Sequence, residues 1–348
     1  MLRIGIIGAR GFTGGELLRL GLAHPAFEVA YVTSESQAGQ PVADGFPGLR
    51  GVTSLKFSAF DSAAAMDRAD AFFFALPDGE AMQRVRPLLE AGKKVVDLSG
   101  DFRVRDPQNY EHWYGRPHLA PDLLEVAAYG MPELGADRVK GASLIANPGC
   151  YPTASLLATA PLFAKGWVRA DSLVIDAKSG VSGAGGRSSL DPAFSFPAIT
   201  DNFRAYGVTG HRHIAEMEQE LCRLSGGGEV VMSFTPHLLP VNRGLMATAY
   251  ADLVEDVSAE LVQDLYCRYY AEAPFVHVLD RGLPELRYVN GSNACHVAVR
   301  VDARTRRVTA ISAIDNLVKG AAGSAIQNMN LACGLDQTAG LRHGAFGP

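Results

Sequence analysis

The chain has 348 residues, a length that suits about two domains, with 47% hydrophobic residues, 20% charged residues and a net charge of −5. This balance is typical of a globular protein with a full core, and because the charges are interspersed we expect no nucleic-acid partner. No apolar run approaches the length of a membrane span, and the first residues run directly into an expected strand, so we expect neither a membrane anchor nor a secretory signal.

A glycine-rich turn follows the first expected strand, residues 2–7, and precedes a helical stretch at 15–20. The turn carries Gly8, Gly11 and Gly14, spaced G-x-x-G-x-x-G instead of the commoner G-x-G-x-x-G. Glycines in this context permit a tight turn, close approach of the backbone to a pyrophosphate, and close helix–strand packing. The strand–turn–helix order therefore predicts dinucleotide binding, and Arg10 is either a positive charge near the phosphates or a solvent-facing loop side chain.

The second strand, residues 27–32, ends in Thr33, Ser34 and Glu35. Enzymes that use NAD usually place an acid at this point, on the ribose 2′-hydroxyl, whereas hydroxyl side chains tolerate a 2′-phosphate. The two hydroxyls favour NADP, and Glu35 leaves NAD open.

A strand, helix and strand then follow at residues 69–77, 80–91 and 93–98, which predicts a doubly wound parallel sheet. Ligands collect at the carboxyl ends of such strands, where Pro77 and the segment 99–103 lie. Arg103 is a candidate anion clamp, because a guanidinium binds carboxylate or phosphate through two hydrogen bonds. The alternative is a surface ion pair with Asp101 or Asp106.

Cys150 lies between an apolar strand, residues 142–145, and a helical stretch at 153–158. The exposed amides and the dipole of a helix start favour an anion, so a thiol there loses its proton more readily than a free cysteine does. We therefore consider Cys150 a candidate nucleophile, with a small buried hydrophobe as the alternative. The cysteines at 150, 222, 267, 295 and 333 suit neither a disulfide framework nor a metal site, and they indicate the reducing cytoplasm.

A serine- and glycine-rich loop at residues 178–189 follows a predicted strand at 172–177. It contains Ser179, Ser182 and Arg187. An arginine among hydroxyls and bare amides suits phosphate or cofactor binding, and a flexible linker is the alternative.

His211 and His213 precede an amphipathic helix marked by Ile214, Met217 and Leu221. The i, i+2 pair is not that of a zinc protease, and we predict no metal. Each histidine alone suits a structural role, but given Cys150 one of the two is expected to act as the acid-base, and the sequence does not choose between them.

The remaining elements predict a second domain of mostly antiparallel strands, at 229–234, 245–253, 294–301 and 308–313, with a helix at 258–271. A helix rich in small residues, 314–330, is expected to dock on the first domain. The predicted fold is α/β: a doubly wound, Rossmann-type domain over residues 1–149, completed by 315–348, and an α+β catalytic and oligomerisation domain over 150–314.

In this order, these motifs resemble the N-acetyl-gamma-glutamyl-phosphate reductases of arginine biosynthesis, with the aspartate-semialdehyde dehydrogenases as more distant relatives. The resemblance rests on segments spread over nearly the whole chain: 8–14, 97–103, 147–153, 179–187, 210–213 and 315–320. It implies NADPH-dependent reduction of an acyl phosphate through a cysteine thioester, in a homo-oligomer, either a dimer or a tetramer.

The resemblance also assigns roles to residues. Cys150 would be the nucleophile, His211 or His213 the base, and Arg103, Asn147 and Arg187 substrate-binding residues. Contacts to NADP are expected from residues of both domains: Gly8, Arg10, Gly11, Phe12, Thr13, Gly14, Ser34, Pro77, Ser179, Ser182 and Asn316.

The chain departs from the family pattern at two places. Arg10 stands where the family usually has serine, which puts a pyrophosphate hydrogen bond in doubt. The Gly185-Gly186 pair makes this segment one residue longer than the family's usual form, so the resemblance does not fix the direction of Arg187.

Three other functions stay open: reduction of aspartyl phosphate, reduction of the carrier-protein-bound substrate of lysine biosynthesis, and a dinucleotide-sensing regulator without turnover. The Pro-Gly-Cys-Tyr-Pro-Thr form at 148–153 favours the arginine branch.

Overall fold

The computed structural model describes residues 1–189 and 191–347, and the side chains of all of these except residues 186–189. The chain forms two compact units, residues 1–148 with 321–342, and residues 149–320 with 343–348. The predicted division instead assigned residue 149 and the whole of 315–348 to the first domain.

The first unit is built on a parallel sheet of order β2-β1-β3-β4-β6-β5. Its strands are β1 (Leu2–Ile7), β2 (Phe27–Val32), β3 (Ala71–Phe74), β4 (Lys94–Asp97), β5 (Ala128–Tyr129) and β6 (Leu144–Ala146). Its helices are α1 (Phe12–Leu22), α2 (Val42–Gly45), α3 (Ser62–Arg68), α4 (Val85–Glu90), α5 (Pro107–Tyr114), α6 (Asp122–Val126) and α11 (Gly323–Ala332). The central strand β3, Ala-Phe-Phe-Phe, is buried throughout, as expected of a strand covered on both faces. The doubly wound parallel sheet is thus confirmed.

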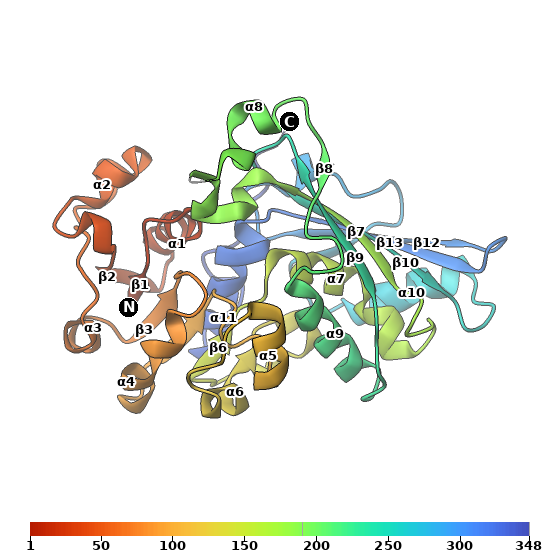
Figure 1. Cartoon of the computed structure of the whole chain (residues 1–348), viewed down its shortest axis with the longest axis horizontal. Helices are drawn as coiled ribbons and strands as arrows, with labels where there is room; N and C mark the ends of the chain where they lie inside the picture. The colour runs from red at the N-terminus through yellow and green to blue at the C-terminus, as the bar shows by residue number, and fades with distance from the viewer. Residues whose placement is uncertain (190, 348) are drawn as a thin grey trace. The chain divides into compact units, whose positions relative to one another are not determined.

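The second unit contains a seven-stranded sheet of order β11-β12-β13-β10-β7-β9-β8. Its longer strands, among them β7, β9 and β10, are labelled in Figure 1. Its strands are β7 (Val174–Gly180), β8 (Arg204–Ala205), β9 (Ser233–Leu239), β10 (Leu245–Asp252), β11 (Val276–Val278), β12 (Cys295–Asp302) and β13 (Arg307–Ile314). The pairs β11–β12 and β7–β9 are parallel and the other neighbours are antiparallel, so the mostly antiparallel sheet is confirmed.

Helices of the second unit are α7 (Cys150–Lys165), α8 (Phe196–Ile199), α9 (His213–Leu224) and α10 (Ala259–Tyr269). Helix α7 packs across β10, β12 and β13, and α9 and α10 pack against α7. Three of the four buried positions along β10 are small, Ala247, Ala249 and Ala251, which lets α7 approach the sheet closely. The Ser312 hydroxyl on β13 donates to the Ala154 carbonyl of α7 at 2.7 Å. Helix α7, which begins at Cys150, is therefore fixed on a rigid platform.

Three predicted elements differ from the observed ones. The expected helix 80–91 is a 3-10 turn, Ala81–Gln83, followed by α4, because the Asp101 carboxylate holds the amides of Gly79 and Met82 at the start of the segment. The expected strand 229–234 begins only at Ser233 and continues through Pro236 to Leu239. The expected helix 314–330 starts as a π-helical turn, Val318–Ala322, and continues as α11.

Candidate active site

In the first unit, the glycine turn joins β1 to α1. Gly8 has φ +81°, a conformation that favours glycine, and its amide donates to the Thr33 hydroxyl at 3.0 Å. A Cβ on Gly14 would lie 2.6 Å from the backbone of Ala9, so this glycine allows α1 to pack against the turn. A Cβ on Gly11, in contrast, would meet nothing within 4 Å. Gly11 is therefore not required by packing, and it leaves the backbone open to a ligand.

The start of α1 fits a pyrophosphate. Its N-cap residue is Gly11, no side chain caps the helix, and no acid stands in its first turn. The first amides and the positive end of the helix dipole therefore favour an anion at Phe12 and Thr13. Phe12 is about half exposed, at 49%, whereas Gly14 is buried.

The end of β2 agrees with NADP more than with NAD. Ser34 is buried, and the Glu35 carboxylate accepts a hydrogen bond from the Phe60 amide at 3.1 Å. Glu35, the acid that kept NAD open as an alternative cofactor, thus accepts a hydrogen bond from the backbone of its own unit. The Arg10 guanidinium lies 5.5 Å from the ring centroid of Phe46, which places its positive charge over an aromatic face beside the glycine turn.

A buried acidic network organises the carboxyl ends of β3 and β4, just after Pro77. The Asp101 carboxylate accepts from the amides of Gly79, at 2.6 Å, and Met82, at 3.1 Å. Asp97 accepts from the hydroxyl of Ser99 at 2.7 Å, and burial followed by the charge of Asp101 raises the pKa of Asp97 to about 7. These bonds fix the loop that carries Arg103.

Arg103 is 7% exposed, and its guanidinium donates to the Leu98 carbonyl at 2.7 Å. Asp101 is occupied by backbone amides, and Asp106 caps α5 by accepting from the Gln108 amide. Arg103 is thus buried and not on the surface, and its role as an anion clamp stays a prediction. A buried guanidinium oriented by its own loop suits the binding of an anion.

Asn147, at the end of β6, is held inside the first unit. Its amide nitrogen donates to the Ala321 carbonyl at 3.2 Å, and its amide oxygen accepts from Asn328 of α11 at 2.9 Å. These bonds tie the strand end to α11, and substrate binding by Asn147 stays a prediction.

Cys150 is the first residue of α7 in the second unit, as the sequence predicted. The N-cap residue Gly149 makes no side-chain cap, and Pro152 in the first turn has no N–H. The donors of the first turn are consequently the amides of Cys150 and Tyr151, which together with the helix dipole favour an anion at this corner. Cys150 is only partly buried, which argues against the alternative of an inert core residue.

The two histidines gather around the ring of Tyr151. Its ring centroid lies 5.6 Å from that of His211 and 6.0 Å from that of His213. The His213 amide donates to Nδ1 of His211 at 3.2 Å, which assigns the proton of the neutral imidazole to Nε2. Burial, and next the charge of Arg212, lowers the pKa of His211 to about 4, so the ring is neutral near pH 7.

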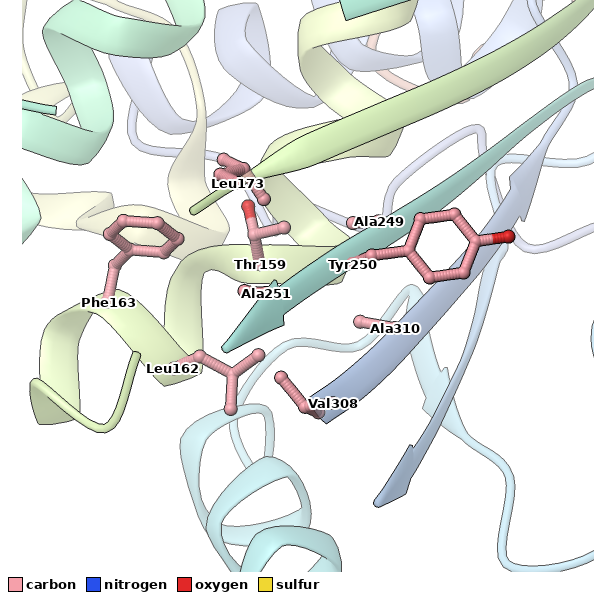
Figure 2. A pocket seen from close by; sticks show the side chains of 9 residues that line it. All are labelled: Thr159, Leu162, Phe163, Leu173, Ala249, Tyr250, Ala251, Val308 and Ala310. Atoms are coloured by element: carbon pink, nitrogen blue, oxygen red, sulfur yellow. The ribbon is translucent and has the colours of Figure 1, made fainter. Parts of the chain in front are cut away.

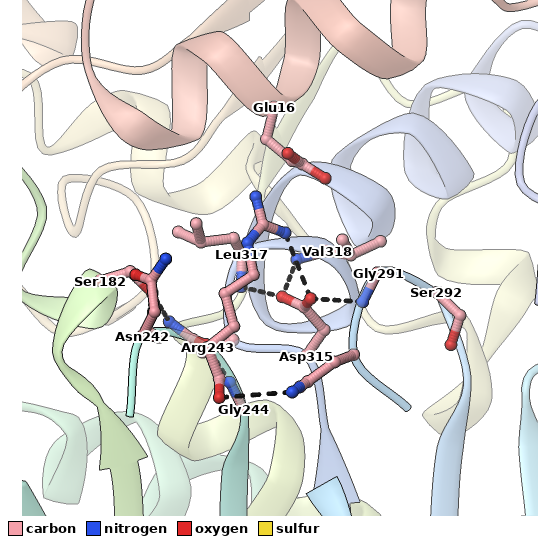
Figure 3. A network of polar contacts seen from close by, with 12 residues as sticks. Glu16, Ser182, Asn242, Arg243, Gly244, Gly291, Ser292, Asp315, Leu317 and Val318 are labelled. Atoms are coloured by element: carbon pink, nitrogen blue, oxygen red, sulfur yellow. Dashed lines mark hydrogen bonds and ion pairs between the residues drawn. The ribbon is translucent and has the colours of Figure 1, made fainter. Parts of the chain in front are cut away.

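Ser182 and Asn316, both predicted as cofactor contacts, are joined within the second unit, beside the polar network of Asp315 that Figure 3 shows. The Asn316 amide nitrogen donates to the Ser182 hydroxyl at 2.9 Å, and its oxygen accepts from the Gly244 amide at 2.7 Å. The neighbouring Asp315 carboxylate accepts from Arg243 and from the amides of Gly291, Leu317 and Val318. Ser179 is buried and donates to the Gly180 carbonyl at 3.0 Å. The side chain of Arg187 lies outside the described residues.

Sequence reasoning missed three residues around Cys150. The Tyr206 hydroxyl donates to that of Tyr151 at 2.9 Å, and burial raises the pKa of Tyr206 to about 12. The Glu216 carboxylate accepts from the Gly149 amide at 3.0 Å. A Cβ on Gly320 would lie 2.8 Å from Cβ of Cys150. Glu216 belongs to the amphipathic helix, where its charge would favour the outer side, and only the fold shows that it is buried and bonded to Gly149.

The second unit also has a small apolar gap between α7 and the sheet, with no room for a water molecule (Figure 2). Its lining includes Leu162, Phe163 and Val308, and it presents no charged group, so it does not suit an anionic substrate. Across the described part of the chain, no three His, Cys, Asp or Glu side chains gather as a metal site. Within the same residues no helix has both the length and the apolar character that crossing a bilayer requires.

Comparisons with known proteins cover almost the entire chain. Residues 3–142 match the family model described as the NAD binding domain of semialdehyde dehydrogenase, and residues 150–316 match the one described as its dimerisation domain. The chain is 48% identical over 342 residues to the N-acetyl-gamma-glutamyl-phosphate reductase of Desulforudis audaxviator, covering 98% of each chain. It is 49% identical to that of Symbiobacterium thermophilum, covering 98% of this chain and 97% of the relative.

Solved structures show the same fold at low sequence identity. Aspartate semialdehyde dehydrogenase II from Vibrio cholerae superposes with a TM-score of 0.72 at 19% identity, covering 96% of this chain and 98% of that one. The enzyme from Candida albicans, solved with NADP, gives a TM-score of 0.70 at 19% identity, covering 95% and 98%.

Proposed function

Because the chain belongs to the family of N-acetyl-gamma-glutamyl-phosphate reductases, we propose that it converts N-acetyl-glutamyl 5-phosphate to N-acetyl-glutamate 5-semialdehyde and phosphate, with NADPH as reductant. The observation that carries the proposal is the position of Cys150. It begins a long helix whose first-turn donors are the amides of Cys150 and Tyr151, with two histidines around the neighbouring ring.

The cofactor fits the residues of the first unit. The open face of Gly11, the uncapped start of α1 and the positive charge of Arg10 suit the phosphates of NADP, and Ser34 suits its 2′-phosphate better than an acid would. Pro77, Ser179, Ser182 and Asn316 are proposed as further contacts. When bound, NADPH supplies the hydride that reduces an acyl carbon.

Cys150 supplies the covalent chemistry. Its thiolate attacks the acyl carbon, the C–S bond forms, and the bond to the phosphate oxygen breaks, so that phosphate leaves with the electron pair and a thioester remains. After reduction, the hemithioacetal oxyanion re-forms the carbonyl and the C–S bond breaks, which returns the thiolate and releases the aldehyde. Amides of Cys150 and Tyr151 are suited to stabilise the oxyanion in both steps.

His211 is suited to hold the same oxyanion. With Nδ1 occupied by the His213 amide, its Nε2–H is a neutral donor, and a neutral imidazole with a lowered pKa can polarise a carbonyl. This assignment gives the two histidines different tasks: the ring of His211 contacts the acyl oxygen, and the main chain of His213 sets its tautomer. Arg103 and Arg187 are proposed to bind anionic groups of the substrate.

The test is an assay in the reverse direction, with NADP and phosphate, of three aldehydes: N-acetyl-glutamate 5-semialdehyde, aspartate semialdehyde and the carrier-bound semialdehyde of lysine biosynthesis. Turnover is expected with the first, and turnover mainly with another would reassign the substrate.

Cys150→Ser is expected to abolish turnover while NADPH binding stays intact. Rapid-quench mass spectrometry with the acyl phosphate and without NADPH is expected to show an acyl adduct on Cys150, and its absence would contradict the thioester route.

We further propose a homo-oligomer that associates through the second unit, because residues 150–316 match a model described as a dimerisation domain. Sedimentation equilibrium would distinguish a dimer from a tetramer, and a monomer at micromolar concentration would contradict the proposal.

The cytoplasm is the proposed location, since all five cysteines are free thiols. Fractionation of the source cells tests this location.

A further inference from the structure

The start of α7 has a feature that its own sequence does not supply. In a common helix start, a Glu or Gln at the third helical position reaches back to the amide of the N-cap residue. In α7 the N-cap residue is Gly149 and the third position is Pro152, which has no carboxylate to reach back. The Gly149 amide nevertheless has an acceptor, because the Glu216 carboxylate of α9 lies 3.0 Å away.

Glu216 is fully buried, which is costly for a carboxylate unless its surroundings compensate. Two sources of compensation are visible. Glu216 stands in the first turn of α9, where the helix dipole favours negative charge, and it accepts the hydrogen bond from Gly149. An apolar side chain would fill the same space without this cost, so the carboxylate has a use beyond packing.

Helix α9 begins at His213, one turn before Glu216, and His211 lies two residues before this start. The Gly149 carbonyl is held as well, since it accepts from the amide and the hydroxyl of Thr153, each at 2.9 Å. Both the amide and the carbonyl of Gly149, immediately before the nucleophile, are therefore held by hydrogen bonds. The bond to the amide comes from α9, the helix that begins at His213.

We infer that Glu216 is a positioning residue: its bond to the Gly149 amide sets Cys150 at a fixed distance from the histidines at the start of α9. It replaces, from another helix, the acid that a capping box would place on α7 itself, and it leaves the amides of Cys150 and Tyr151 for the acyl oxygen. The inference rests on the proposed function, in which these groups act on one carbonyl.

The experiment compares Glu216→Ala, Glu216→Gln and Glu220→Ala. Glu220 is the matched control, because it lies one turn further along α9 and is equally buried, but it pairs with Arg223 at 2.8 Å. Steady-state rates are measured in the reverse direction, each corrected for the folded fraction at the assay temperature.

Glu216→Ala is expected to lower kcat about 100-fold, since a displacement of about 1 Å has an effect of this order, with KM for aldehyde and phosphate within about threefold. Glu216→Gln keeps an oxygen acceptor for the Gly149 amide, so its kcat is expected within about fivefold of the parent. Glu220→Ala is expected to lower stability while kcat stays within about threefold.

Three results would overturn the inference: a kcat of Glu216→Ala within about threefold of the parent, an equal loss in Glu216→Gln, or the same loss in Glu220→Ala. Should Glu216→Ala fail to fold, Glu216→Leu fills the space without the acceptor and takes its place, with the same expectations. Should the parent protein reduce none of the aldehydes, the proposed function fails. The rate of Cys150 alkylation by iodoacetamide then still tests the bond, and it is expected to fall about tenfold in Glu216→Ala and to be unchanged in Glu216→Gln.

Discussion

Residues around Cys150 determine how much space its side chain has and where it points. Gly320 is the clearest case, because a Cβ there would lie 2.8 Å from Cβ and 3.2 Å from Cα of Cys150. Gly320 does not have a positive φ, so its backbone accepts alanine, and the effect of a substitution is steric.

Gly320→Ala is therefore expected to displace Cys150 and to lower kcat by about 10- to 100-fold, with little change in KM. Steady-state kinetics measure both constants. Gly228→Ala is the control, because the nearest atom its Cβ would meet is 4.0 Å away, and its kcat is expected to equal that of the parent. Equal activity of the two variants would show that the site tolerates the extra methyl group.

Arg103 is the second residue with a specific expectation. Loss of a hydrogen bond to a charged group costs about 1.5–3 kcal/mol, so Arg103→Ala is expected to raise KM for the acyl phosphate by about 10- to 100-fold with kcat changed less. Arg105→Ala, on an exposed side chain two residues away, serves as the control. Unchanged kcat and KM in a folded Arg103→Ala variant would show that Arg103 does not bind the anionic substrate.

At the scale of elements, the glycine turn assigns separate tasks to two glycines. A Cβ on Gly14 would overlap the backbone of Ala9 at 2.6 Å, so Gly14→Ala is expected to destabilise the first unit by about 1–3 kcal/mol. Gly11→Ala meets no atom within 4 Å and is expected to cost less than about 1 kcal/mol, yet to weaken NADPH binding about tenfold or more by covering the phosphate site. Thermal unfolding and fluorescence titration separate the two effects, and a stable Gly14→Ala variant or full NADPH affinity in Gly11→Ala would contradict this division.

The elements that could be predicted from the sequence are those whose signals are local. Local patterns indicated the β1–α1 turn, the helix after His211 and Cys150 at a strand-to-helix corner, because period, glycine spacing and dipole act within a few residues. Glu216 and Gly320 could not be found in this way, since their roles depend on Cys150, which lies 66 and 170 positions away along the chain. Strand β9 was misplaced because Pro236 is a reason to end a strand, yet β9 continues beside β7 with Pro236 opposite Ala177.

For the whole molecule, both units share a histidine arrangement that makes them sensitive to acid. In His24, His118 and His211, Nδ1 accepts a hydrogen bond from the backbone amide two residues later, at 3.1, 3.1 and 3.2 Å. An Nδ1 that accepts a proton loses this acceptor role, so the bond requires the neutral ring. Burial lowers the pKa of all three rings, and that of His296 in the second sheet as well.

The sign of the effect follows from proton linkage. Since the pKa of each ring is lower in the folded chain than its ordinary value of 6.5, the unfolded chain binds more protons between the two values. Stability is therefore complete above about pH 6.5 and falls as the pH drops below it, by at most about 1.4 kcal/mol per pH unit for each ring that stays neutral. Asp97 acts in the opposite direction, because its raised pKa of about 7 makes the folded chain bind the additional proton as the pH falls toward 4.

Comparing variants separates the effect of a histidine on stability from that of Asp97, because Asp97 is present in the parent and in each variant. His118→Gln removes a ring whose Nε2 also lies 2.8 Å from the Asp101 carbonyl, and His112→Gln removes an exposed ring on α5. Thermal midpoints measured from pH 8 to pH 5 are expected to fall in the parent below about pH 6.5 and to fall as steeply in His112→Gln. They are expected to fall less steeply in His118→Gln, although that variant is less stable at pH 8, where it lacks the two bonds of the neutral ring. If the three pH profiles are parallel, the buried ring of His118 does not contribute to the acid sensitivity, and the carboxyl groups must account for it.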